Sequence, residues 1–203
     1  DGASIINGFA KDTSREEVLA KTASLQLPSI LQTVNVNYGD VAYIPAGQIH
    51  ALRRGTVVAE IQQTSDITYR VYDYHRPDKD GNYRELHVEK AVEVLNYQRT
   101  TPPLIPYRLP AVNTVCQLVK DSHFTTNYIR LTEIVTRDYT ALDSFVVYMC
   151  VWGKTEITVQ DAESGYQTIW LKKGETALLP ASLVDVSLRP LTTQSRVLEV
   201  YIA

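Results

Sequence analysis

Gly39-Asp40-Val41-Ala42-Tyr43-Ile44-Pro45-Ala46 is the most informative stretch of this sequence, because it recurs without a gap as Gly174-Glu175-Thr176-Ala177-Leu178-Leu179-Pro180-Ala181. Each copy places a glycine and an acidic residue before a short apolar run that ends in Pro-Ala. Glycine beside an acidic residue favours a tight turn, and proline is tolerated at the end of a strand. The repeat therefore predicts two turn-plus-strand units, each followed by a strand that brings one side chain into the mouth of a β-barrel.

The residues that follow each copy indicate what the barrel holds. His50 stands five residues after the first proline and Asp185 five after the second, and a strand glutamate comes next in both, Glu60 and Glu199. The pattern resembles the second motif of the cupins, small antiparallel barrels that often enclose a metal. The resemblance implies that His50 is a metal ligand, and that Asp185 replaces this ligand in the second copy.

Short apolar runs separated by turn residues continue along the chain at intervals of roughly ten positions. They predict a mainly β fold of cupin-type antiparallel barrels or jelly rolls, with a few short helices in the N-terminal half. Residues 144–152 are almost continuously apolar and predict a strand buried on both faces. The expected strands are residues 3–9, 34–38, 41–44, 49–52, 57–61, 68–74, 112–120, 128–136, 144–152, 155–160, 166–171, 177–180, 184–188 and 197–202.

Two helices are expected from capping-box spacing, in which a polar residue precedes a glutamate by three positions. Ser14 and Glu17 predict a helix over residues 15–24, and Asn82 and Glu85 predict one over residues 83–95. Four prolines within residues 99–110 predict an extended linker. We therefore expect domains over residues 1–98 and 111–203.

The overall composition excludes several classes of function. The 203 residues include 20 Lys and Arg against 23 Asp and Glu, a net charge of −3, so no positive excess favours nucleic acid or anionic membranes. No apolar run approaches the roughly 20 residues that cross a bilayer. Cys116 and Cys150 are the two cysteines, too few for a disulfide framework. Residues 1–10 lack the features of a secretory signal, and we expect a cytoplasmic protein.

The stretch after His50 carries the chemistry. A carboxylate follows at Glu60, a second at Asp66, and an arginine at Arg70. A neutral imidazole suits zinc, a carboxylate can transfer protons, and an arginine pairs with phosphate or with a developing oxyanion. This set predicts metal-assisted chemistry on an anionic substrate.

Three ordered strings in this region resemble the bacterial type I mannose-6-phosphate isomerases, also called phosphomannose isomerases. They are Pro45-Ala46-Gly47-Gln48-Ile49-His50-Ala51, then Glu60-x-Gln62-Gln63-x-Ser65-Asp66-x-Thr68-Tyr69-Arg70-Val71-Tyr72-Asp73-Tyr74, then Arg84-Glu85-Leu86-His87. The match is dense between residues 39 and 92. The resemblance implies zinc-dependent interconversion of mannose 6-phosphate and fructose 6-phosphate through a cis-enediol.

The same resemblance implies a role for each residue. His50 would be a zinc ligand, Glu60 the glutamate of proton transfer, Asp66 an active-site carboxylate, and Arg70 the arginine that stabilises the charged intermediate or, with Glu60, binds substrate. The family's other zinc ligands, a glutamine, a histidine and a glutamate, and a phosphate-side lysine lie in the first half of its catalytic cupin. From the resemblance we expect this sequence to begin after that half. We therefore expect residues 1–98 to be the second half of the catalytic cupin and residues 111–203 a degenerate cupin-like domain.

A single histidine cannot fill a four-coordinate zinc site. We expect this chain alone to be inactive, with the missing half supplied either by another polypeptide or within a longer protein. An alternative interpretation is a non-catalytic cupin that binds sugar or regulates, although such a module needs no acid–base carboxylate beside a metal ligand. A cupin epimerase or dioxygenase is a second alternative, and it would need a His-x-His pair that does not occur here.

Overall fold

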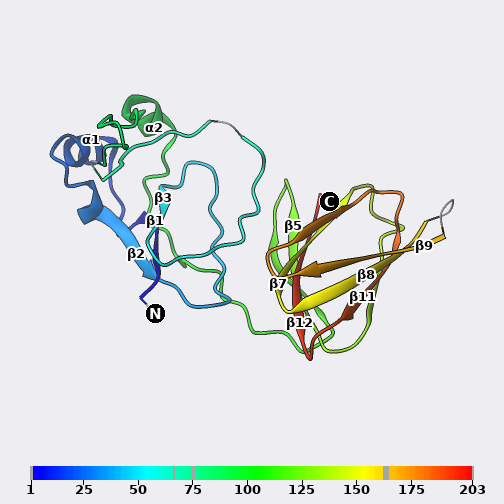
Figure 1. The fold of residues 1–203 in the computed structure, drawn as a ribbon. Helices are drawn as coiled ribbons and strands as arrows, with labels where there is room; N and C mark the ends of the chain where they lie inside the picture. Colours follow the sequence, from blue (N-terminus) through cyan, green and yellow to red (C-terminus); the bar gives the residue numbers. More distant parts are fainter. Residues whose placement is uncertain (1, 66, 75, 162–164, 203) are drawn as a thin grey trace. The chain divides into compact units, whose positions relative to one another are not determined.

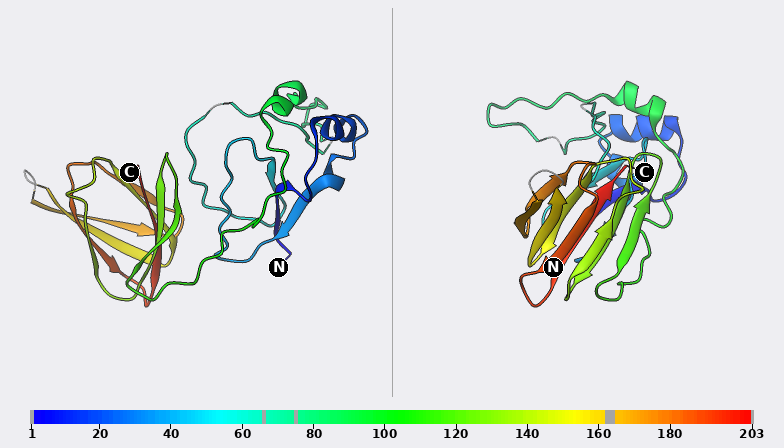
Figure 2. Two further views of the ribbon diagram at one scale, coloured as in Figure 1. Left: turned by 180° about the vertical axis from the view of Figure 1, so that it is seen from behind. Right: turned by 90° about the vertical axis from the view of Figure 1, so that its right-hand side faces the viewer.

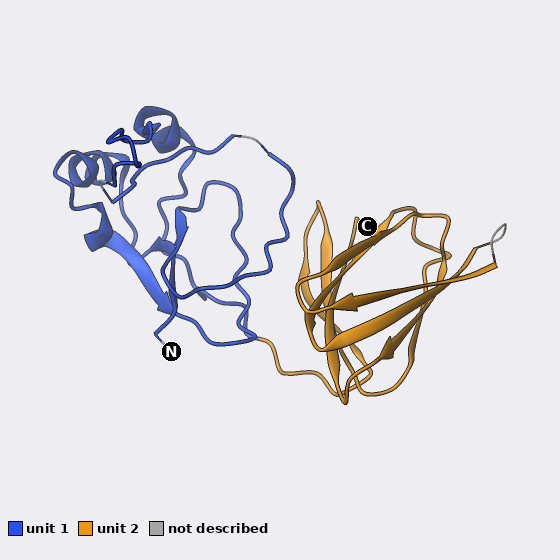
Figure 3. Ribbon diagram, in the orientation of Figure 1, with its two compact units in different colours: residues 1–106 blue, residues 107–203 orange. Residues whose placement is uncertain are grey.

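The computed structural model describes residues 2–65, 67–74, 76–161 and 165–202. The chain divides into two compact units, residues 1–106 and residues 107–203 (Figure 3). Among the described residues, no helix has the length and apolar character needed to cross a membrane.

The first unit combines a small antiparallel sheet with two helices (Figure 1). Its sheet has the order β2-β1-β3, and its apolar core lies between the sheet and the helices, centred on Phe9, Val18 and Val92. The elements are β1 (Ser4–Phe9), α1 (Arg15–Ala23), the 3-10 helix η1 (Leu27–Ile30), β2 (Leu31–Asn35), β3 (His50–Leu52) and α2 (Val88–Val94).

Helix α1 begins where expected, with Ser14 as its N-cap, because the Ser14 hydroxyl accepts a hydrogen bond from the Glu17 backbone N–H at 3.2 Å. The Glu17 carboxylate accepts from the Thr13 hydroxyl at 2.7 Å. The second capping box is wrong, since α2 begins only at Val88. The Asn82 backbone N–H instead donates to the Asp78 carboxylate at 2.9 Å, which holds that stretch in a turn. The helix can therefore start only after the turn and the segment that follows it.

Three expected strands of the first unit do not form, those over residues 41–44, 57–61 and 68–74. A strand exists only where a second backbone runs alongside it, and within the described residues these segments make only isolated backbone contacts. Val41 accepts one hydrogen bond from Ile105 at 2.8 Å, and Arg70 pairs with His87. These three segments have strand-like composition, but in the described part of the chain no neighbouring strand pairs with them.

The second unit consists of two antiparallel sheets, with the orders β10-β7-β12-β5-β4 and β6-β11-β8-β9. The sheets lie face to face (Figures 1 and 2), and residues of both fill one core, among them Ile129, Val197, Ile157 and Leu188. The strands are β4 (Val115–Lys120), β5 (Thr125–Leu131), β6 (Val135–Asp138), β7 (Val146–Trp152), β8 (Lys154–Asp161), β9 (Gly165–Lys172), β10 (Thr176–Leu179), β11 (Asp185–Pro190) and β12 (Ser195–Tyr201). The prediction of a mainly β, cupin-type antiparallel fold is confirmed.

Two strand predictions in this unit need correction. The single strand expected over residues 128–136 is interrupted, because the Asn113 side chain accepts hydrogen bonds from the backbone of Thr132 and Glu133 at 2.8 and 3.1 Å. The chain then passes to the other sheet as β6. Strand β7 is buried on its inner face only, while the alternate residues are half-buried.

The repeated motif forms the same local turn in both units. Gly39 and Gly174 both adopt positive φ, 94° and 90°, a conformation that glycine reaches without steric cost. In the second unit the motif continues into β10 and ends at Pro180, as expected. In the first unit no strand follows the turn.

Candidate functional site

His50 opens β3, where its backbone pairs with Asn7 of β1. The side chain is exposed, and its Nδ1 atom lies 3.0 Å from the carbonyl oxygen of Gln48. A carbonyl only accepts hydrogen bonds, so this contact assigns the proton to Nδ1 and leaves the lone pair on Nε2. Metal-binding histidines are oriented in the same way, by a hydrogen bond from the nitrogen that does not bind the metal.

The loop before His50 is held by a fully buried side chain. Asn7 donates from Nδ2 to the carbonyl of Pro103 at 2.7 Å and accepts from Nε2 of Gln48 through Oδ1. The backbone N–H of Gly8 donates to the carbonyl of Ile49 at 2.8 Å. Gln48 and Ile49, the two residues before His50, are thus tied to β1, and the carbonyl that accepts from the imidazole has a fixed position. Sequence reasoning missed Asn7, whose only signal was a polar residue within an apolar strand.

Arg70 is held beside the last of the three strings that carry the family resemblance. Its backbone N–H donates to Nδ1 of His87 at 3.2 Å, and its carbonyl accepts from the His87 N–H at 2.7 Å. The guanidinium donates to the carbonyl of Glu85 at 3.1 Å. These contacts bring Arg70 of the second string together with Glu85 and His87 of the third.

An ion-pair cluster in the same segment joins the buried Asp73 to two arginines that are half-exposed or more. Asp73 accepts two hydrogen bonds from Arg84, one of them from Nε at 2.7 Å, and one from Arg76 at 2.9 Å. Hydrogen bonds from Arg84 and then Arg76 hold the pKa of the Asp73 carboxyl well below its usual range. Sequence reasoning did not single out this cluster, although an acidic residue amid apolar ones with two arginines downstream was a usable signal.

The remaining predicted residues are not joined to these. Glu60 is exposed, and no polar contact in the described part of the chain links it to His50 or Arg70. Asp66 lies outside the described residues. Among the residues that the structure describes, no three His, Cys, Asp or Glu side chains gather as metal ligands would. His50 is thus a single oriented imidazole, and the described residues do not form a complete metal site around it.

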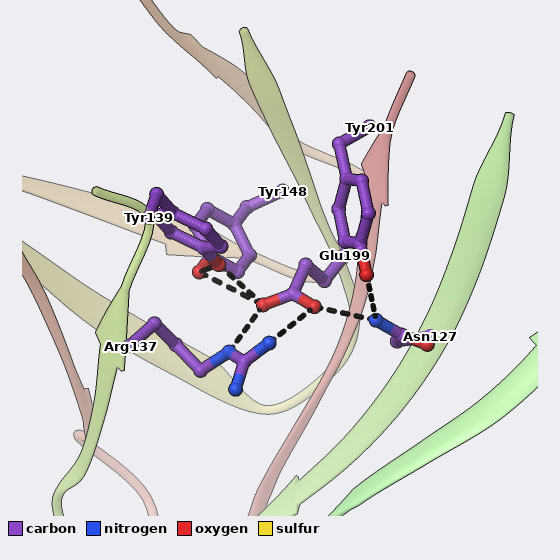
Figure 4. A network of polar contacts seen from close by, with 6 residues as sticks. All are labelled: Asn127, Arg137, Tyr139, Tyr148, Glu199 and Tyr201. Carbon is purple, nitrogen blue, oxygen red and sulfur yellow. Dashed lines mark hydrogen bonds and ion pairs between the residues drawn. The ribbon is translucent and has the colours of Figure 1, made fainter. Parts of the chain in front are cut away.

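The second unit has a polar centre of a different kind, built around the fully buried Glu199 of β12 (Figure 4). Arg137 donates to its carboxylate from Nε at 2.7 Å and from a terminal nitrogen at 3.1 Å, and Asn127 donates at 2.7 Å. The hydroxyls of Tyr139 and Tyr148 also donate to it. Every oxygen of the carboxylate is satisfied within the protein.

Burial, and then the neighbouring charge, raises the pKa of Tyr139 and Tyr148 well above the usual tyrosine range. Both hydroxyls therefore stay protonated and act as donors to Glu199 at all ordinary pH values. Asp185, expected at the position of His50, opens β11 with an exposed side chain, whereas the next residue, Val186, faces the core. The polar centre of this unit is therefore an ion pair between Arg137 and Glu199.

Comparison with known proteins agrees with this picture. Over 186 residues the chain is 32% identical to the mannose-6-phosphate isomerase of Streptococcus mutans, covering 90% of this chain and 55% of that protein. A putative mannose-6-phosphate isomerase of Bacillus subtilis is 32% identical over 195 residues, 93% of this chain and 58% of the relative. The chain belongs to the mannose-6-phosphate isomerase family.

The fold of the family is matched as well. The crystal structure of mannose 6-phosphate isomerase from Bacillus subtilis superimposes with a TM-score of 0.72 at 26% identity, over 98% of this chain and 60% of that one. No family model matches the sequence. The chain spans a little over half the length of the mannose-6-phosphate isomerases that it matches.

Proposed function

We propose that this chain forms part of the active site of a zinc-dependent isomerase that interconverts mannose 6-phosphate and fructose 6-phosphate. The observation that carries the proposal is the orientation of His50, whose Nδ1 is bound to the carbonyl of Gln48 so that Nε2 is left for a metal. The cytoplasmic location predicted from the sequence remains part of the same proposal.

The residues of the proposed site then have the following roles. The Glu60 carboxylate would move the proton between C2 and C1 of the sugar, with Asp66 as a second carboxylate of the site. Arg70 would bind the phosphate or the oxyanion of the enediol, with its guanidinium already anchored on Glu85. Zinc, when bound, acts as a Lewis acid towards the substrate oxygens.

The donors present fit zinc only in part. Structural and catalytic zinc sites use at least three protein ligands, and His50 is the single oriented candidate in the described part of the chain. We therefore propose that the other ligands come from a segment that corresponds to the part of the relatives which this chain does not span, in the same or another polypeptide.

Exposed apolar side chains support the same idea. Val57 is 98% exposed, Ile67 66% and Tyr38 63%, and they lie in or near the segments that failed to form strands. Solvent-exposed apolar residues in strand-like segments are what remains when neighbouring strands are absent. A β-rich partner segment would pair these backbones and bury these side chains together with the metal site.

The decisive test is reconstitution. The chain is purified alone and together with the part of the Bacillus subtilis enzyme that it does not match, and zinc content and conversion of fructose 6-phosphate are measured. We expect activity and about one zinc in the assembled protein only. An assembled protein that binds zinc but does not isomerise would contradict the function, and full activity of the chain alone would contradict the need for a partner segment.

Matched variants assign the roles within the assembled protein. His50→Ala should lose zinc, whereas His123→Ala, a half-exposed histidine of the second unit, should retain it. Arg70→Ala should lower kcat by about a hundredfold, the effect of removing one electrostatic donor. Arg53→Ala, an exposed arginine of the same unit, should leave kcat unchanged.

A further inference from the structure

Strand β9 forms one edge of the sheet β6-β11-β8-β9, so its outer side has no neighbouring strand in the described part of the chain. It has eight residues, whereas the edge strands β6 and β10 have four each. Only Leu171 of β9 is buried, and the side chains of Tyr166, Trp170 and Ile169 are 76%, 60% and 45% exposed. A long apolar edge of this kind is a template on which another strand can pair.

The hydrogen bonds around β9 show which of its backbone groups face the free edge. The Lys173 backbone N–H donates to the carbonyl of Gly153 at 3.1 Å, which continues the register of β9 with β8. Alternate residues of an antiparallel strand bond to the same neighbour, so the odd-numbered residues of β9 bond to β8. The backbone N–H of Lys172 agrees, because it donates to the Glu175 carboxylate at 2.9 Å. The groups at the free edge are therefore those of the even-numbered residues.

A second copy of β9 can satisfy these outward groups, which belong to Tyr166, Thr168 and Trp170. Outward residues must oppose outward residues, and an antiparallel pair centred on Thr168 places Thr168 opposite itself and Tyr166 opposite Trp170. Each opposed pair then exchanges two hydrogen bonds. The three side chains share the face opposite to the buried Leu171, and the Thr168 hydroxyl lies 3.1 Å from that of Thr158 there. A tyrosine thus faces a tryptophan on both sides of the centre, which stabilises a strand pair.

The charges along β9 suit the same arrangement. Residues 165–171 carry no charge, Lys172 and Lys173 come at the end of the strand, and Asp161 of β8 pairs with Gly165 at its start. An antiparallel pair brings the acidic start of one copy beside the basic end of the other, and it keeps the lysines of the two copies at opposite ends. Lysine within an edge strand discourages pairing, and β9 has none before its last residue.

We propose that two copies of this chain associate through β9, as an antiparallel pair centred on Thr168. The two sheets then form one continuous sheet across a twofold axis, and the assembly closes at two copies because each β9 has one free side. A single strand pair is a small interface, so the dimer should dissociate on dilution. The contact uses neither His50 nor the exposed segments of the first unit, and it does not depend on the proposed function.

Sedimentation equilibrium of the full chain, over about a hundredfold range of concentration, tests the proposal. We expect the mass to rise with concentration from that of one chain towards that of two. Thr168→Lys places two ammonium groups opposite each other and should stay monomeric where the parent chain is dimeric. Gln117→Lys adds the same charge to the exposed edge strand β4 and should dimerise as the parent chain does. Circular dichroism verifies that both variants fold.

Thr168→Pro is a second disruptive variant, because it removes an outward N–H that β8 does not use. It should raise the dissociation constant of the dimer by about tenfold or more. A mixture tests the register itself. Thr168→Glu alone should also stay monomeric, whereas Thr168→Lys and Thr168→Glu mixed in equal amounts should form a heterodimer, since opposite charges then face each other across the axis.

The proposal is overturned if the parent chain stays monomeric over the whole range, or if the folded Thr168→Lys and Thr168→Pro variants dimerise as the parent does. The second outcome would place the contact on another surface, such as the exposed apolar segments of the first unit. The register is overturned if the mixture of the Lys and Glu variants does not associate.

Discussion

His50 and Glu199 follow two copies of one sequence motif, yet they lie in opposite surroundings. His50 is exposed on a three-residue strand, with one ring nitrogen bound and the other directed to no described partner. Glu199 is fully buried between two sheets and is satisfied by an arginine, an asparagine and two tyrosines.

The comparison shows that the turn of the motif depends on local sequence, whereas the burial of the polar group near it depends on the packing of the whole unit. Its turn forms in both units because a glycine and an acidic residue suffice for it. A closed polar centre forms only where a second sheet covers it, as in residues 107–203. In the second unit the polar centre is covered by two sheets, whereas in the first unit His50 and several apolar side chains are exposed.

The largest effect is expected at the closed centre. Arg137→Ala would leave Glu199 buried without its counter-charge, which costs about 3–5 kcal/mol in the free energy of unfolding. Urea unfolding followed by tryptophan fluorescence reports on this unit, since it contains both tryptophans. Arg189→Ala breaks a pair in which Arg189 is half-exposed and Glu156 keeps its hydrogen bond from Trp170, and it should cost much less than Arg137→Ala. Equal losses in the two variants would contradict the distinction drawn here.

A smaller effect is expected where the turns of the second unit meet. Gly153 has a φ of 71°, and a Cβ atom there would lie 2.5 Å from the carbonyl oxygen of Gln194. Gly153→Ala should therefore lower the free energy of unfolding by about 2–3 kcal/mol, through strain and a clash with backbone. Gly165→Ala has a similar φ of 74° in open space and should cost only about 1 kcal/mol. Both are measured by the same urea unfolding.

In the first unit, Asp73 should make local stability depend on pH. Its pKa is lowered in the folded state by Arg84 and Arg76, so its stabilisation is present above the unfolded pKa of about 4 and is lost on further acidification. Asp73→Asn should speed hydrogen exchange in residues 68–90 at pH 7, and the difference between the two proteins should begin to shrink near pH 4 and narrow steadily on further acidification. Asp80→Asn, an exposed aspartate of the same loop, should exchange like the parent chain at pH 7.

The smallest effect is expected at His50 itself. Because its side chain is exposed, His50→Ala should change the free energy of unfolding of the unassembled chain by no more than about 0.5 kcal/mol. Hydrogen exchange in β1 and β3 measures this directly. A large loss would show that His50 supports the fold and would contradict the proposal that it serves as a metal ligand.

The start of α1, the strands of the second unit and the family could be predicted from the sequence, because they depend on local signals. Ser14 and Glu17 fix the start of α1 through contacts within one turn, and period-two apolar patterns mark nearly every strand of the second unit. The residues around His50 likewise indicated the family that the comparisons establish. Local patterns could not reveal which strand-like segments lack neighbours, as residues 57–61 do.

The sequence by itself determined the turns of the two motifs, the antiparallel β character and the family, because these depend on residues close together along the chain. Only the tertiary structure decided that Asn7 and Gln48 orient His50, that Asp73 is held by Arg84, and that Glu199 is closed off by Arg137. These contacts join residues from 11 to 62 positions apart, or a side chain to a neighbouring carbonyl, and they exist only once the backbone is folded. Whether a polar group is a buried support or an open ligand follows from what packs around it, and spacing along the chain does not encode that.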